Sequence, residues 1–137
     1  MKRIEPVSIE TARHLVDFGG GAMSKALAED QLQGAVALQN VLAKEDFAYL
    51  ADEVGMGKTY VALGVVALIR FFHPGFRVLY ITPRENIHRK WIKELQNFTA
   101  TNWKWVDQKV KSYQKTPCVE VNCCRITTSL SSMRPTT

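Results

Sequence analysis

The sequence of 137 residues has no apolar run long enough to cross a membrane. Its longest apolar run, from Tyr60 to Ile69, falls well short of the ~20 residues that a bilayer requires. The N-terminus also lacks the apolar segment of a signal peptide. These absences exclude a membrane-spanning helix and predict a cytoplasmic protein with no membrane partner.

Cysteine is scarce and clustered. The three cysteines, Cys118, Cys123 and Cys124, are odd in number and follow no export signal. This pattern predicts free thiols in a reducing compartment rather than a disulfide framework. A structural zinc site needs about four ligands at recognisable spacing, and no histidine lies near these cysteines, so a metal site is not expected here.

Acidic residues are scarce in the second half of the chain. Residues 1–69 carry 6 basic and 9 acidic side chains, a net charge of 6 − 9 = −3, whereas residues 70–137 carry 12 and 4, a net charge of +8. Such asymmetry indicates that the second half faces a polyanion such as nucleic acid. A solvated basic surface, or a face that docks on an acidic domain, would give the same charge pattern.

The apolar residues recur with helical and strand spacing in alternation. The pattern predicts helices over residues 24–42, 60–72 and 86–98, and strands over residues 47–51 and 77–82. Strands that alternate with helices are typical of an α/β fold, in which helices cover a parallel sheet. The sequence therefore predicts a parallel sheet with covering helices.

A glycine-containing loop joins the first predicted strand to the next helix, with the sequence D-E-V-G-M-G-K-T over residues 52–59. Gly55 and Gly57 allow a tight turn that brings backbone N–H groups to phosphate oxygens, and the helix N-terminus adds a partial positive charge. Lys58 is expected to reach the β- and γ-phosphates, and the Thr59 hydroxyl to coordinate magnesium. The strict phosphate-loop pattern has glycine where this chain has Asp52, so a glycine turn that merely starts a helix is the alternative.

Three segments of the chain together resemble one family. The D-E-V-G-M-G-K-T segment resembles the first helicase motif of superfamily two in the form typical of Swi/Snf-type ATPases. Upstream, Q-L-x-G at residues 31–34 is similar to the glutamine motif of that family. Downstream, L-Y-I-T-P at residues 79–83, followed by a helix with Trp91, Glu94 and Phe98, resembles its next motif. The helical spacing of Trp91 and Phe98 favours core positions over a base-stacking role.

The resemblance implies a partial, incomplete RecA-like P-loop NTPase lobe that uses ATP and magnesium. It implies that Gln31 faces adenine and that Thr59 holds magnesium. It also implies double-stranded DNA as the partner of the parent protein, and hence a nucleoid-associated location if the source is prokaryotic. The cofactor-binding residues that it implies are Gln31, Gly55, Met56, Gly57, Lys58 and Thr59, and the residues against the nucleic-acid backbone are Thr82, Pro83 and Arg84.

The catalytic set of this family is incomplete in the sequence. Its ATPases need an adjacent Asp-Glu pair at the end of a later strand, yet the carboxylates after Thr59 are isolated: Glu85, Glu94, Asp107 and Glu120. The second RecA-like lobe, which supplies an arginine finger, is also missing. We therefore expect a lead-in segment over residues 1–24, the N-terminal part of a helicase ATP-binding lobe over residues 25–115 and a disordered or aberrant tail over residues 116–137. Such a chain alone is expected to be inactive.

Two other functions are compatible with parts of this pattern. The first is that of a non-catalytic remnant that binds nucleotide or a protein partner without hydrolysis. An unrelated P-loop enzyme such as a small kinase is disfavoured by the Q-L-x-G match and by the helix that contains Trp91 and Glu94.

Overall fold

The computed structural model describes residues 3–19, 24–51, 55, 57–74, 76–104, 111–112 and 122–127. Within these residues the chain forms four helices and three strands. In order, they are α1 (Ile9–Leu15), α2 (Lys25–Glu45), α3 (Lys58–Phe72), β1 (Val78–Thr82), α4 (Glu85–Thr101), β2 (Lys111–Ser112) and β3 (Asn122–Thr127). None of the helices in the described part of the chain is both long and apolar enough to span a bilayer.

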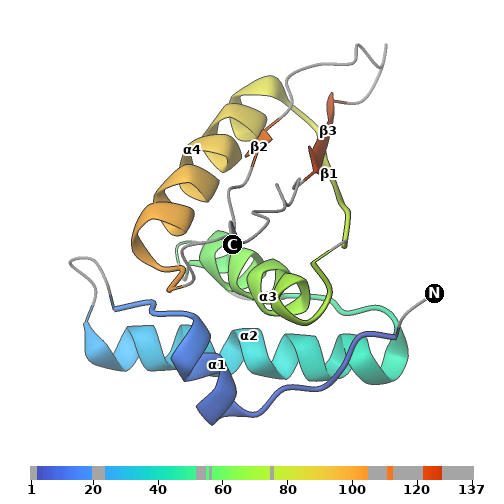
Figure 1. Cartoon of the computed structure of the whole chain (residues 1–137). Coiled ribbons are helices and arrows are strands. Elements are labelled where there is room, and N and C mark those ends of the chain that lie inside the picture. Colours follow the sequence, from blue (N-terminus) through green and yellow to red (C-terminus); the bar gives the residue numbers. More distant parts are fainter. Residues whose placement is uncertain are drawn as a thin grey trace, which may run out of the picture.

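The elements are arranged around α3. Helices α1 and α2 lie on one side of it, and α4 with strands β1 and β3 lies on the other (Figure 1). The helix α3 is rich in apolar residues on all sides, which is typical of a helix that is covered by neighbours. Its Leu68 is completely buried, and the core continues into α2 through Ala35 and into α4 through Leu95 and Phe98.

The three predicted helices are confirmed, with small shifts at their ends. Helix α2 begins where Ser24 accepts a hydrogen bond from the Leu27 N–H over 3.3 Å, which is ordinary N-capping. It extends three residues past the predicted end and stops at Asp46, whose backbone is left-handed (φ 63°). Helix α3 begins two residues earlier than predicted, and α4 begins one residue earlier and ends three residues later.

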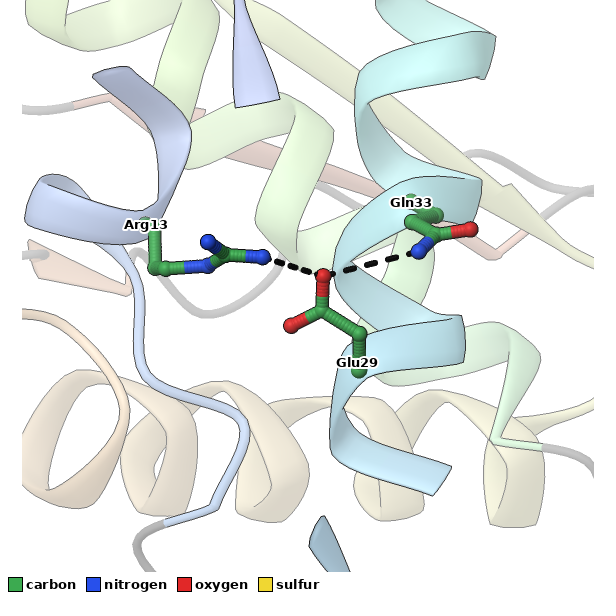
Figure 2. Close-up of polar contacts among 3 residues, drawn as sticks. All are labelled: Arg13, Glu29 and Gln33. Carbon is green, nitrogen blue, oxygen red and sulfur yellow. Dashed lines mark hydrogen bonds and ion pairs between the residues drawn. The ribbon is translucent and has the colours of Figure 1, made fainter. Parts of the chain in front are cut away.

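The N-terminal segment is fastened to the long helix α2. The Asn40 side-chain amide accepts from the Val7 N–H (2.8 Å) and donates to the Val7 carbonyl (3.2 Å), as a neighbouring strand would. On the surface, the Glu29 carboxylate of α2 pairs with Arg13 of α1 and accepts a long hydrogen bond from Gln33 (Figure 2). The Arg13–Glu29 pair is exposed and contributes little stability. Helix α1 is therefore held in place by its buried side.

The sheet differs from the predicted one. Strand β1 confirms the strand predicted over residues 77–82, but it pairs antiparallel with β3, with Tyr80 opposite Cys124 and Thr82 opposite Asn122. Strand β2 pairs antiparallel with the other edge of β3, which gives the order β1-β3-β2. The predicted parallel sheet is thus not confirmed within the described residues.

The prediction of a strand over residues 47–51 is wrong. Residues 47–51 form no strand, and the Phe47 and Tyr49 side chains are 73% and 86% exposed. A strand depends on ladder hydrogen bonds to a neighbour, and none of the described strands pairs with this segment. The strand was predicted from the apolar composition of the segment alone. Apolar composition favours burial, but it does not determine which strand the segment would pair with.

Strand β3 lies in the stretch of residues 116–137 that was predicted to be a disordered or aberrant tail. The sequence did not predict that residues 122–127 pair with β1. The remaining residues of that stretch lie outside the described part of the chain.

Candidate functional site

The candidate site begins at the N-terminus of α3. Gly57 precedes the helix with a left-handed backbone (φ 77°, ψ 25°), and Gly55 also has a positive φ of 94°. The first helical hydrogen bonds run from the N–H groups of Tyr60 and Val61 to the Gly57 carbonyl. The Thr59 N–H, one residue before Tyr60, therefore has no acceptor within the helix, and Gly57 offers no side chain to cap it. Such a helix start binds anions well.

Lys58 and Thr59 are the first two residues of α3, and both are half-buried. Both side chains therefore leave the backbone in the first turn of the helix. This is the donor set that a polyphosphate requires, because lysine neutralises phosphate charge and a threonine hydroxyl can coordinate magnesium. Met56, which was also predicted to belong to the site, lies outside the described residues.

Gln31 connects the long helix α2 to this loop. Its side chain is only 3% exposed, and neither its Nε2 nor its Oε1 has a hydrogen-bond partner. It packs directly against Gly57: a Cβ atom at position 57 would lie 3.1 Å from the Gln31 Cδ and would overlap its Nε2. Position 57 thus requires glycine for two reasons, its backbone conformation and its contact with Gln31.

An unpartnered buried amide is costly, so its presence needs an explanation, such as a ligand that it contacts. The Gln31 amide can donate and accept at once, which suits the edge of a purine base. The loop glycines, the helix start and the Gln31 amide therefore fit a nucleotide with its magnesium ion. Thr59 would hold the metal and Lys58 the phosphates, and the bound nucleotide would supply the phosphoanhydride chemistry.

Carboxylates for hydrolysis are not gathered at this loop in the described part of the chain. No group of three or more His, Cys, Asp or Glu residues is placed there to hold a metal ion. Asp52 and Glu53, the acidic pair next to the loop, lie outside the described residues. The described arrangement therefore offers donors that suit a triphosphate, but no cluster of carboxylates that could hold a metal ion.

The three residues predicted to touch nucleic acid lie at the junction of β1 and α4. Thr82 ends β1 and is buried, and its hydroxyl has no hydrogen-bond partner. Pro83 and Arg84 are exposed, and Arg84 occupies the N-cap position of α4. Of these three residues, Pro83 and Arg84 therefore present accessible side chains and Thr82 does not.

The exposed face of α4 carries further cations that are already paired. Arg89 forms an ion pair with Glu85 at 2.8 Å, and Lys90 lies 3.7 Å from Glu94. These pairs connect residues one helical turn apart, as on a solvated helix surface. The opposite face of α4 is apolar, and Phe98 belongs to the core as predicted.

Sequence reasoning missed one charged residue in the interior. Arg70 lies on α3, is 5% exposed and has no hydrogen-bond partner for its Nε. Burial lowers the pKa of its guanidinium. The signal was present in the sequence, because Arg70 interrupts the apolar stretch from Tyr60 to Phe72.

One comparison with known proteins gives a match. A search of curated proteins and a search of solved structures each found no match. The family model of the type III restriction enzyme res subunit matches residues 24–133, which are 110 of the 137 residues. The match includes α2, the glycine loop, α3, β1 and α4. The chain therefore belongs to the type III restriction enzyme res subunit family, and the matched part is a RecA-like, helicase-like ATPase domain of superfamily two.

Proposed function

We propose that this chain is the nucleotide-binding part of an ATP-dependent DNA helicase or translocase of the Swi/Snf type. ATP binds with its triphosphate at the start of α3 and with its base near Gln31, and Thr59 coordinates magnesium. The parallel sheet, the acidic second motif and the second lobe of such an ATPase complete the enzyme in the parent protein. Double-stranded DNA is its substrate track, and the cytoplasm, or the nucleoid in a prokaryote, is its location.

One observation carries this proposal. The Gln31 side chain is buried without hydrogen bonds, and it touches the glycine that starts the phosphate-binding helix. Sequence positions 31 and 57 are far apart, so their contact is a tertiary feature rather than a result of local spacing. A glycine turn that only starts a helix would not need an unpartnered amide against it.

The finer assignment to the Swi/Snf type depends on the sequence of the loop. Its D-E-x-G-M-G-K-T form, with Asp52 in place of the usual glycine, is the form typical of that type. The downstream residues Thr82, Pro83 and Arg84 follow as the DNA-contacting segment in this proposal.

The test is nucleotide binding by the purified chain and by Lys58→Ala. A fluorescent ATP analogue with magnesium is expected to bind the unaltered chain, and Lys58→Ala is expected to weaken binding at least tenfold, because a charged phosphate contact is lost. Lys25→Ala, at the start of α2, is the matched control and should bind as the unaltered chain does. Equal affinity of Lys58→Ala and the unaltered chain would reject the site.

The second candidate function is a module that binds nucleotide or a protein partner without hydrolysis. The absence of a carboxylate cluster among the described residues favours it for the isolated chain. Phosphate release with and without duplex DNA separates the two candidates. We expect no DNA-stimulated release from this chain alone, and a chain extended by an acidic motif and a second lobe should release phosphate.

A further inference from the structure

The most exposed large apolar side chains in the described part of the chain lie in pairs on two segments. Phe47 and Tyr49, which follow α2, are 73% and 86% exposed, and Leu79 and Ile81 of β1 are each 60% exposed. No other large apolar side chain among the described residues is more than 45% exposed. Single exposed apolar residues are ordinary, whereas apolar side chains that gather on a surface indicate contact with a partner.

Both segments turn these side chains outward with the period of a β-strand. After α2, Phe47 and Tyr49 are exposed, while the residues next to them, Ala48 and Leu50, are half-buried, and Leu50 packs against the core. Strand β1 shows the same alternation from its first residue to its last. Because alternate residues of a strand point to opposite faces, each segment presents one row of two apolar side chains to solvent.

The strands in the described part of the chain leave an edge of each segment unpaired. The order β1-β3-β2 gives β1 a neighbour on one edge only among these strands. Residues 47–51 pair with none of the described strands, β1 of the same copy included. The unpaired N–H and C=O groups of a strand edge are a template for a strand of another chain.

The two segments match each other in sequence at a constant offset of 32 residues (79 − 47 = 32). In a parallel pairing at this offset, an aromatic side chain meets an aliphatic one twice on the exposed face, and a carboxylate meets a guanidinium at one end. The pairs are Phe47 with Leu79, Tyr49 with Ile81 and Glu45 with Arg77. Cross-strand pairs of both kinds stabilise a sheet. The antiparallel register that pairs the same apolar side chains places Lys44 opposite Arg84, so the charges favour the parallel one.

The flanking charges also select which segment of a second copy is the partner. Acidic residues stand on both sides of residues 47–51 in the sequence, and arginines stand on both sides of β1. They are Glu45, Asp46, Asp52 and Glu53 around residues 47–51, and Arg77 and Arg84 around β1. Like segments from two copies would bring like charges together, whereas unlike segments bring opposite charges together.

We propose that two copies of this chain associate by parallel pairing of residues 47–51 of one copy with the free edge of β1 of the other. The pairing is reciprocal, so a two-fold dimer contains it twice and covers the exposed apolar side chains of both segments in each copy. The proposal does not depend on nucleotide binding.

Sedimentation velocity of the full chain tests the proposal, because the partner is the chain itself. We expect a concentration-dependent dimer at protein concentrations up to about 300 µM, since an interface of this small size is weak. Tyr49→Ser and Ile81→Ser should each raise the dimer dissociation constant at least tenfold, because each removes a large apolar side chain from both pairings. A chain that stays monomeric at about 300 µM would overturn the proposal.

Val41→Ser is the matched control for these two variants. Val41 is an exposed apolar residue of α2 that lies outside both segments, so its dimer dissociation constant should equal that of the unaltered chain. All three side chains are exposed, so the substitutions should leave the fold intact, which circular dichroism checks. An equal loss of association in all three variants, or in none of them, would contradict the pairing.

A charge exchange tests the register. Arg77→Glu and Glu45→Arg should each weaken the dimer severalfold, because like charges then face each other at one end of each pairing. The double variant restores opposite charges and should associate within about twofold of the unaltered chain. Arg89→Glu makes the same charge change on the exposed face of α4 and should leave the dissociation constant unchanged. A double variant that associates no better than Arg77→Glu would overturn the proposed pairing.

Discussion

The two sides of α3 differ in how completely their apolar residues and those of the neighbouring elements are buried. On the α2 side, Leu32, Ala35 and Val61 are buried and close-packed. On the strand side, β1 exposes Leu79 and Ile81, each to 60%. The apolar faces that α2 and α3 turn toward each other are therefore buried, and this pair of helices carries the candidate nucleotide site. Strand β1, in contrast, presents an apolar face to solvent.

The difference has a physical origin. A helix satisfies its own backbone hydrogen bonds, so two amphipathic helices need only each other to bury their apolar faces. A strand in an α/β domain is buried on both faces by elements that are distant in sequence. Mutations that compare the two sides should therefore have unequal costs.

The largest expected effect is that of truncating the Leu68 side chain, which lies in the buried core. Leu68 lies on α3 and is 0% exposed, so Leu68→Ala leaves a cavity in the core. We expect a loss of about 3 kcal/mol in the free energy of unfolding. Urea denaturation followed by circular dichroism measures this loss. The slope of the unfolding free energy against urea concentration should be the same for the variant and the unaltered chain.

Leu79→Ala is the matched control on the strand side. The same side-chain truncation at a position that is 60% exposed should change the free energy of unfolding by less than about 0.5 kcal/mol. Equal costs for Leu68→Ala and Leu79→Ala would remove the distinction between the two sides.

A smaller effect is expected at the junction of α2 and the glycine loop. Gly57→Ala forces a side chain into a backbone with φ 77° and against Gln31, and should cost about 1–2 kcal/mol. Gly55→Ala has a similar φ but no atom near its Cβ, so it should cost less. Thermal or urea unfolding of both variants measures the difference.

The clash itself can be isolated by a double variant. Gln31→Ala removes the atoms that a Cβ at position 57 would meet. Gly57→Ala should therefore cost less in the Gln31→Ala background than in the unaltered chain. Additive costs would show that Gln31 and Gly57 are not in contact.

The helices could be predicted from the sequence because their signals are local. Ser24 caps α2, and the spacing of Trp91, Leu95 and Phe98 along α4 places the apolar face of that helix. The start of α3 was predicted within two residues, because Gly57 and Lys58 are its local boundary signal.

The sheet could not be predicted, because strand pairing is not local. The segment at Phe47 was predicted to be a strand from its composition, yet no described strand pairs with it. The partner of β1 is β3, about 40 residues further along the chain, and no short-range pattern specifies that antiparallel register.

The residues of the candidate site were predictable by type, but not their contacts. The glycine loop was evident from its sequence, whereas the contact of Gln31 with Gly57 required the packing of α2 on α3. The burial of Arg70 was not predicted, because it depends on the elements that pack around α3 and not on the local sequence.

The most direct test of the central claim is the response of backbone amides to magnesium and ADP in a ¹⁵N-resolved NMR spectrum of the chain. The account predicts that the amide signals of Gly55, Gly57, Lys58 and Thr59 and the side-chain amide of Gln31 shift on titration, while those of α1 do not. Saturating nucleotide that leaves these five residues unperturbed would contradict it.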